Sequence, residues 1–270
     1  MVYKTRRRHT MNEFIKESVQ KQFSKNPENY VKNAWHAKGD DLAFLVASSE
    51  VEGSMTVLDI ATGGGHVANA LAPLAAQVTA YDLTRDMLQA AENFIRGNGH
   101  DNVVFTEGDA EQLPFADETF DRVTCRIAAH HFPDVPKFVS EAFRVLKPGG
   151  KLLLIDNVAP EADELDIFYN DVEKLRDPSH VRAWKKSEWI RVLELSGLRI
   201  ELVKRFRKAF QFQSWCQRGG VSPEDTALLE TKLLQTSPDV YRFFSIETDE
   251  SGSLVSFAGE SVYIQAVKLP

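Results

Sequence analysis

The chain has 270 residues, of which 43% are hydrophobic and 26% charged, and a net charge of −7. One domain with elaborations fits this length, and the acidic balance argues against a general nucleic-acid binder, which usually shows a basic surface. No apolar run approaches the roughly 18 residues that a membrane span requires.

The N-terminus and the cysteines bear on the compartment. Residues 1–10 (MVYKTRRRHT) carry three arginines with no apolar segment behind them, which is not a secretory signal and predicts an unstructured basic tail. Cys125 and Cys216 lie far apart in sequence and indicate no disulfide framework. We therefore expect a reducing, cytoplasmic setting.

The first half of the chain alternates predicted strands and helices. Residues 12–35 show mixed helical spacing interrupted at Pro27, and 40–49 predict a short helix. Strands are then expected at 57–60, 77–82, 102–106, 121–127 and 151–156, and helices at 66–74, 84–97 and 134–146. This alternation is typical of a parallel sheet covered by helices on both faces, with ligands at the carboxyl ends of the strands.

Beyond residue 157 the pattern is looser. Residues 158–183 show no clean period, and the next expected elements are a helix, a strand, a helix and a strand over 188–196, 198–206, 224–235 and 261–268. Bases and aromatics are mixed in 204–215 (KRFRKAFQFQSW), as in some nucleic-acid binders. The alternation of Ile200, Leu202 and Phe206 favours a sheet strand that runs into a covering segment.

The stretch from Thr56 to Gly65 (TVLDIATGGG) organises the chain. A buried strand runs into three glycines, whose missing Cβ atoms allow a tight turn and close approach of a ligand to the backbone. Strand, turn and helix N-terminus together form a nucleotide-type site. With Asp82 as the acid, Gly63-x-Gly65-x-x-Ala68 also fits a dinucleotide site, so an NAD(P)-dependent oxidoreductase stays open, as does a purely structural turn.

Five motifs in order favour a different cofactor. They are Asp59-x-Ala61-x-Gly63-x-Gly65, Asp82 closing the second strand, GDAEQLPF (108–115), FDRVTCRIAAHHF (120–132) and RVLKPGG (144–150). The series, over roughly residues 20–156, resembles class I S-adenosylmethionine-dependent methyltransferases, and more narrowly the branch similar to ubiquinone/menaquinone-biosynthesis methyltransferases. The resemblance implies a Rossmann-like, doubly wound α/β fold whose seven-stranded, mostly parallel sheet has an antiparallel last strand and helices on both faces. The implied cofactor is S-adenosyl-L-methionine.

The resemblance also implies how that cofactor is held. Asp82 accepts hydrogen bonds from the ribose hydroxyls, Asp109 accepts from the adenine amino group, and the Ala110 N–H reaches the ring. The backbone of Ala61 and Gly63 holds the methionine arm, with Asp59 ordering the loop beneath. Further cofactor contacts are expected from Thr62, Gly65, Leu83, Arg126 and Tyr30.

Several of these roles have alternatives. Asp82 could cap the helix 84–97, and Asp109 could form a turn after Gly108. Phe23 and Tyr30, expected in an N-terminal lid over the cofactor, could equally pack in a core. Ala61 and Thr62 stand where the family has its first loop glycine and often a cysteine; we expect Ala61 to keep a negative φ and both residues to be tolerated.

Three histidines are candidate catalytic residues: His130 and His131 at the end of the fourth strand, and His180 in the polar stretch 176–184. Methyl transfer needs an in-line approach and exclusion of water, and a general base only when the acceptor must lose a proton. The alternative to a catalytic role for His130 and His131 is packing within the cover. The alternative for the stretch 176–184 is a solvated loop. A metal site that adds Asp134 matches no standard spacing, and no metal is expected.

The organisation of the chain follows from the same resemblance. A single methyltransferase domain over 1–270 is expected to hold its cofactor in a core of about 36–156. Three segments, 12–35, 157–186 and 207–248, are expected to cover the acceptor. Aromatic residues concentrate after residue 156, which indicates an apolar or aromatic small-molecule acceptor and no nucleic acid. A protein that binds the cofactor without catalysis stays open, and the oligomeric state cannot be inferred.

Overall fold

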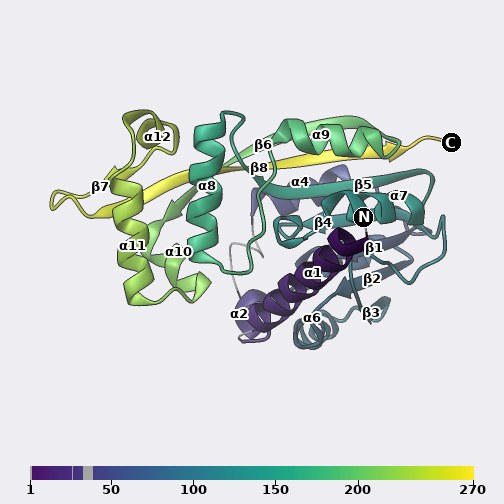
Figure 1. The fold of residues 1–270 in the computed structure, drawn as a ribbon. Coiled ribbons are helices and arrows are strands. Elements are labelled where there is room, and N and C mark those ends of the chain that lie inside the picture. The colour runs from purple at the N-terminus through teal and green to yellow at the C-terminus, as the bar shows by residue number, and fades with distance from the viewer. Residues whose placement is uncertain (1, 26, 33–38) are drawn as a thin grey trace.

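The computed structural model describes residues 2–25, 27–32 and 39–270, and for residues 2–10, 29, 30 and 32 it describes the backbone alone. Within these described residues, eight strands form one sheet. Their bounds are β1 (Thr56–Ile60), β2 (Gln77–Asp82), β3 (Val103–Glu107), β4 (Phe120–Arg126), β5 (Leu146–Val158), β6 (Leu198–Gln211), β7 (Glu247–Thr248) and β8 (Leu254–Lys268). The order is β3-β2-β1-β4-β5-β8-β6, and the two-residue β7 pairs with β8 outside it (Figure 1).

The direction of the strands confirms the expected fold class. Strands β3, β2, β1, β4 and β5 pair in parallel, and the last strand, β8, lies antiparallel between β5 and β6. The path of the chain reverses between β1 and β4, because β2 and β3 lie on one side of β1 and β4 and β5 on the other. In such sheets the carboxyl ends beside the reversal form a crevice for ligands.

Helices cover both faces of the sheet. The helices are α1 (Val2–Phe23), α2 (Pro27–Lys32), α4 (Asp40–Ser48), α5 (His66–Leu71), α6 (Arg85–Gly97), α7 (Val135–Val145), α8 (Asp163–Arg176), α9 (Lys186–Leu195), α10 (Phe212–Gly219), α11 (Pro223–Leu234) and α12 (Pro238–Phe243). One apolar core lies under α4, α5 and α6, and a second lies under α7 and α9. Successive residues of β5 alternate between them, with Leu152 and Leu154 in one core and Leu153 and Ile155 in the other, as a pleated strand requires.

A third apolar cluster lies beyond the sheet proper. Helices α8, α10, α11 and α12 gather around the outer ends of β6 and β8 (Figure 1). The two strands stay paired as far as Gln211 and Ser256, and buried aromatic residues such as Trp215 and Phe257 fill the space between strands and helices. This cluster forms the cover, and it is attached to the sheet by continuous strands.

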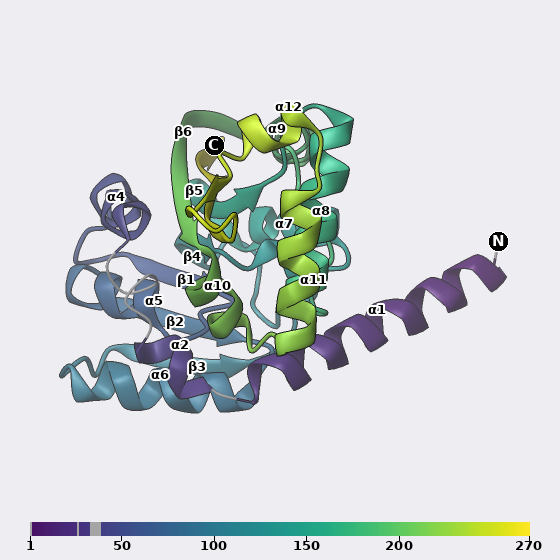
Figure 2. The same cartoon turned by 90° about the vertical axis from the view of Figure 1, so that its left-hand side faces the viewer.

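Several elements differ from the sequence-based expectation. Helix α8 occupies most of 158–183, where no period was found, and its charged first turn and buried Tyr169 and Val172 explain the weak pattern. Strand β5 begins at Leu146 and includes the KPGG turn expected to separate helix from strand. At the N-terminus α1 begins at Val2, where an unstructured tail was expected, and its first turns project from the body (Figure 2). Among the described helices, none is both long and apolar enough to cross a bilayer.

Candidate active site

A pocket opens at the carboxyl ends of β1, β2 and β4, beside the reversal of strand order. Its floor includes Asp59, the loop 61–64 and Asp82, and its sides include Asp109, Ala110 and residues 126–128. The structure thus brings together nine of the eleven residues that the sequence named as cofactor contacts. The other two are Gly65, which lies behind the loop, and Tyr30, whose side chain lies outside the described part of the chain.

Asp59 fixes the floor of this pocket. Its carboxylate accepts hydrogen bonds from the Thr62 hydroxyl at 2.6 Å and the Thr124 hydroxyl at 2.7 Å, which ties the loop to β4. The side chain is almost fully buried, and burial raises the pKa of Asp59 to about 6 despite these two bonds. The predicted loop-ordering position is therefore occupied by a carboxylate whose charge is poorly solvated.

Asp82 holds the other side of the loop. One carboxylate oxygen accepts the Gly63 N–H at 2.9 Å and the other accepts the Thr84 N–H, also at 2.9 Å. The bond to Thr84 lies at the start of α6, so Asp82 does bind the helix N-terminus, as the structural alternative requires. It also faces the pocket, and burial raises the pKa of Asp82. Each oxygen has a further lone pair for a ligand hydroxyl.

The expected negative φ of Ala61 is wrong. Ala61 lies in the left-handed region with φ +53°, and Gly63 follows with φ +54°. The loop turns sharply between Asp59 and the first turn of α5, and a residue with a Cβ adopts this conformation only at a cost of about 1–2 kcal/mol. The substitution of alanine for the family's glycine therefore stores strain in the loop.

Gly65 serves packing. It precedes α5 with φ +81°, and a Cβ there would lie 2.9 Å from Ile95 Cδ1 and 3.0 Å from Ala91 Cβ. Only glycine allows α5 and α6 to approach this closely. Gly65 thus supports the loop through the packing of α5 against α6 and does not itself line the pocket.

Helix α1 lies over the pocket, and sequence reasoning missed most of its contribution. Lys16 Nζ lies 2.7 Å from the Asp109 carboxylate and 2.5 Å from Glu111, and the Gln20 side chain donates to the Leu83 carbonyl at 2.9 Å. Val19 and Phe23 line the pocket beside them. Only Phe23 was identified beforehand, because the contacts join residues more than sixty positions apart, which no local pattern reveals.

Arg126 lies at the edge of the pocket, and its guanidinium is part of a buried ion pair. Two of its nitrogens lie 3.2 and 3.0 Å from the Asp41 carboxylate of α4. Lys208 of β6 lies 3.4 Å from the same carboxylate. The predicted cofactor contact is therefore also a structural link between α4, β4 and β6.

A second cavity adjoins the first, and we call it the acceptor cavity. The two share Phe23, Arg126, Ile127 and His131, while α8, β6 and α10 form the far wall of the acceptor cavity. Ile127 has φ +56°, an uncommon conformation for a β-branched residue, and it lies on the boundary. Strained backbone of this kind is concentrated at functional sites.

The structure brings the three candidate histidines together in the acceptor cavity. The ring centroids of His130 and His131 are 4.2 Å apart, and those of His130 and His180 are 5.5 Å apart. All three line the cavity, and the Phe23 ring meets His131 edge to face at 5.2 Å. The cluster joins the end of β4 to the loop after α8.

His130 differs from the other two because it has a buried carboxylate partner. Its Nδ1 lies 2.6 Å from Asp156 Oδ1, and its backbone N–H donates to Asp156 Oδ2 at 2.8 Å. Burial alone would lower the pKa of His130, but the Asp156 charge outweighs burial and raises it. The bond through Nδ1 leaves Nε2 as the ring nitrogen able to take a proton. Asp156, at the end of β5, was not identified from the sequence.

Burial holds His131 and His180 in the neutral form. His131 Nδ1 lies 3.1 Å from the Ser179 carbonyl, and burial, with neighbouring His130, lowers the pKa of His131 to about 4. His180 Nε2 lies 2.9 Å from Asn170 Oδ1, and burial, again with His130, lowers the pKa of His180 to about 2.

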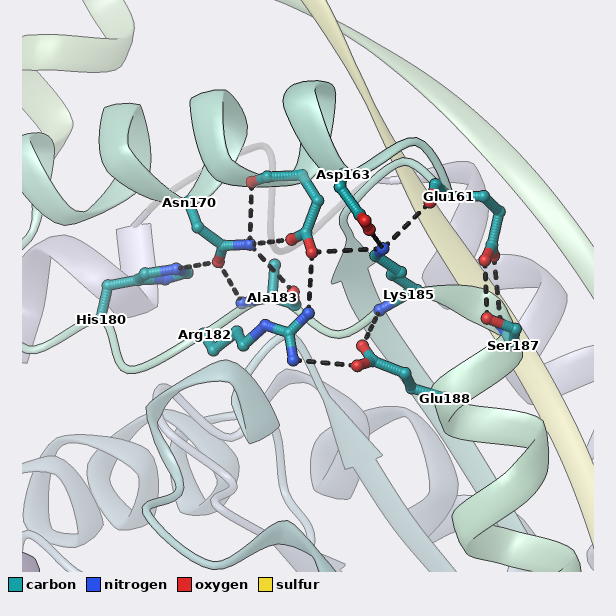
Figure 3. A network of polar contacts seen from close by, with 10 residues as sticks. Glu161, Asp163, Asn170, His180, Arg182, Ala183, Lys185, Ser187 and Glu188 are labelled. Atoms are coloured by element: carbon teal, nitrogen blue, oxygen red, sulfur yellow. Dashed lines mark hydrogen bonds and ion pairs between the residues drawn. The ribbon is translucent and has the colours of Figure 1, made fainter.

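A network of polar contacts anchors the loop that carries His180 (Figure 3). Asn170 of α8 binds His180 and both backbone groups of Ala183, and Arg182 bridges Asp166 and Glu188 at 2.8 and 2.9 Å. The stretch 176–184 is therefore a fixed wall of the acceptor cavity and not a solvated loop. In the described part of the chain, no group of three or more histidine, cysteine or acidic side chains could hold a metal ion.

Comparison with known proteins identifies the class. A family model described as a methyltransferase domain matches residues 58–154. The methyltransferase YcgJ of Bacillus subtilis, itself uncharacterised, is 39% identical over 91% of this chain and 97% of its own length. The chain belongs to the S-adenosylmethionine-dependent methyltransferases, which confirms the resemblance and its cofactor and decides against the NAD(P)-dependent alternative.

Particular relatives sharpen the assignment. The structure of BH2331 from Bacillus halodurans, a proposed methyltransferase, is 52% identical and covers 86% of this chain and all of its own, with a TM-score of 0.84. The crystal structure of YcgJ is similar at a TM-score of 0.83, covering 85% of this chain and 98% of its own. A ubiquinone/menaquinone biosynthesis C-methyltransferase of Desulfotalea psychrophila is 40% identical over 43% of this chain and 47% of its own length.

Replacing Ala61 with glycine should stabilise the protein. Glycine adopts a φ of +53° without the steric cost that alanine bears, so we expect the free energy of unfolding to rise by about 1 kcal/mol in urea titrations. The contrasting variant is Gly65→Ala, which adds strain and a clash with Ile95 and should lower it by about 2–4 kcal/mol. A less stable Ala61→Gly protein would contradict the strain at this position.

Replacing His180 with glutamine should reduce sensitivity to acid. Folding lowers the pKa of His180 from 6.5 to about 2. Below pH 6.5 the unfolded chain therefore binds a proton that the folded protein does not, and the free energy of unfolding decreases as the pH is lowered. Glutamine removes this proton uptake and can still donate to Asn170. Between about pH 6 and 4, unfolding free energies of the variant should fall less steeply, by up to about 1.4 kcal/mol per pH unit.

The matched control for this prediction is His100→Gln, which removes a histidine outside the cluster. We expect its unfolding free energy to follow that of the unsubstituted protein. Parallel curves for all three proteins would show that His180 does not resist protonation in the folded state.

Proposed function

We propose that this methyltransferase transfers the methyl group of S-adenosylmethionine to a small molecule bound in the acceptor cavity and releases S-adenosylhomocysteine. The observation that carries the proposal is the meeting of the two cavities at Phe23, Ile127 and His131, beside the His130–Asp156 pair. A methyl group directed from the first cavity toward the second would meet its acceptor where α1 and the β4 end exclude water.

The residues of the first pocket fit this cofactor. The sulfonium and ammonium groups of S-adenosylmethionine are cations, and Asp59 and Asp82 are buried carboxylates whose pKa values burial raises, so a cation beside them would restore the solvation they lack. The backbone at Gly63 is open, since a Cβ there would have no neighbour closer than 3.8 Å. We assign the methionine arm to the Asp59–Gly63 loop, with Thr62 ordering that loop.

The remaining cofactor roles are proposals of the same kind. Asp82 would accept the ribose hydroxyls through its outer lone pairs, and Leu83 and Ala110 would border the adenosine. Asp109 would accept from the adenine amino group beside Lys16, which holds its second oxygen. The bound cofactor supplies an electrophilic methyl group, and the chain supplies position and exclusion of water.

His130 is the best-placed general base. Asp156 fixes the ring through Nδ1, which leaves Nε2 directed to the proton of an acceptor hydroxyl, amine or acidic C–H, and the carboxylate stabilises the imidazolium that forms. His131 and His180, with their depressed pKa values, are weaker bases, and we assign them to shaping the cavity. We also propose the domain organisation expected from the sequence, a single domain whose cover carries the wall of the acceptor cavity.

The remaining inferences concern partners and location. The acidic chain and its sheet-bound 204–211 segment support a small-molecule acceptor in place of nucleic acid. Both cysteines are free and buried, which supports a cytoplasmic setting.

Replacing Asp82 with asparagine should weaken the binding of S-adenosylhomocysteine by about tenfold or more, because a hydrogen bond to a charged group is lost. Isothermal titration calorimetry measures this, with Asp86→Asn as the matched control, since Asp86 lies four residues on, is exposed and does not line the pocket. Unchanged affinity in Asp82→Asn would refute the ribose role. Binding of NADH in preference to S-adenosylhomocysteine would refute the proposed function.

Replacing Asp156 with asparagine should lower the pKa of His130. In the folded protein Asp156 raises that pKa, so the neutral, basic form of His130 accumulates only as the pH rises through a value above 6.5. Without the carboxylate this transition should move to lower pH, as followed by NMR titration of the imidazole. The control is Asp171→Asn, an exposed acid of α8. An unshifted His130 titration would contradict the pairing.

A further inference from the structure

Cationic side chains outnumber acidic ones in the lining of the acceptor cavity. Four cations line it: Arg126 of β4, Arg176 of α8, Lys208 of β6 and Arg218 of α10. The acidic groups beside them are Glu173 and Asp177 in the wall and Asp41 behind it, while Asp156 is engaged by His130. The lining itself therefore holds four cations and two acids, and the other two acids, Asp41 and Asp156, lie behind it.

Two of the cations share one carboxylate. Asp41 lies 3.0 Å from Arg126 Nη2 and 3.4 Å from Lys208 Nζ, and its side chain is only 4% exposed. Burial, with Arg126 nearby, lowers the pKa of Lys208, so the charged form of Lys208 is poorly solvated. An anion bound on the cavity side of Lys208 would stabilise the charged form of that side chain.

The two arginines form the opposite wall. Arg176 is fixed by three contacts: its Nε donates to the Trp215 carbonyl at 3.2 Å, its guanidinium lies 4.8 Å from the Trp215 ring centroid, and Glu173 is 3.7 Å away. Burial and the charge of Arg176 lower the pKa of Arg218. Glu173 is the acid that contacts Arg176, and burial raises the pKa of Glu173. The wall is therefore rigid and cationic.

We propose that the acceptor carries an anionic group, a carboxylate or a phosphate, which binds between Lys208 and the Arg176–Arg218 wall while the methyl-accepting atom lies toward His130 and the cofactor pocket. Planar guanidinium groups bind both kinds of anion through paired N–H donors. Phe23 and Phe210 line the same cavity and suit an aromatic or apolar body for the acceptor. This inference rests on the proposed function, since it names the substrate class of the same site.

The test compares matched anionic and neutral probes. Benzoate and phenyl phosphate, with benzamide and benzyl alcohol as neutral partners, are titrated by calorimetry into the protein saturated with S-adenosylhomocysteine. We expect at least one anion to bind about tenfold tighter than its neutral partner, because a charge-assisted contact is gained. The difference between benzoate and phenyl phosphate identifies the preferred anion.

Two variants locate the anion. Lys208→Met leaves Asp41 paired with Arg126, and Arg218→Gln removes one charge from the wall. Each should weaken binding of the preferred anion by about tenfold and leave the affinity for S-adenosylhomocysteine unchanged, since neither residue lines the cofactor pocket. Lys204→Met is the matched control, a lysine of the same strand that is exposed and contacts Phe44.

The outcomes separate this inference from the proposed function. Failure of the unsubstituted protein to bind S-adenosylhomocysteine overturns both. With that binding intact, neutral probes that bind as tightly as the anions, or no binding by any probe, overturn the anionic acceptor alone. An anion affinity that survives in both Lys208→Met and Arg218→Gln places the anion outside this cavity and overturns it as well.

Discussion

Burial of negative charge at the carboxyl ends of β1 and β2 is the constraint on which the site depends. Asp59 and Asp82 are removed from water by the same packing that closes the sheet, and hydrogen bonds from Thr62, Thr124, Gly63 and Thr84 compensate only part of the lost solvation. The loop between them takes its shape from these bonds. A cationic cofactor is the partner such a site favours, and the strain accepted at Ala61 is consistent with a loop held for binding.

The two cavities are opposite in electrostatic character. The cofactor pocket has Asp59, Asp82 and Asp109 on its lining, and the acceptor cavity has an excess of arginine and lysine. Phe23 and Ile127 line both cavities, and Arg126 also belongs to both, so one cation of the acceptor cavity reaches the edge of the cofactor pocket. This arrangement suits the two ligands that we propose, a cationic cofactor and an anionic acceptor in adjacent cavities.

The sequence predicted the elements whose signal lies in the spacing of nearby residues. Apolar runs and amphipathic spacing located the strands and helices of the core, and the motif series located the pocket. It did not reveal α8, whose polar face dominates its sequence, or the positive φ of Ala61, which depends on how the loop closes. Lys16 and Asp156 were missed because their partners, Asp109 and His130, are 93 and 26 positions away. Such contacts exist only once the strands are ordered.

The attachment of the cover has a consequence for ligand exchange. Because β6 and β8 run unbroken from the sheet into the cover and stay paired to Gln211 and Ser256, the wall of the acceptor cavity cannot swing away as a separate body. Helix α1, in contrast, is held over both cavities by a few side chains such as Lys16, Gln20 and Gln22. A displacement of α1 would therefore open both cavities together and leave the sheet intact, whereas a displacement of the cover would break the pairing of β6 with β8.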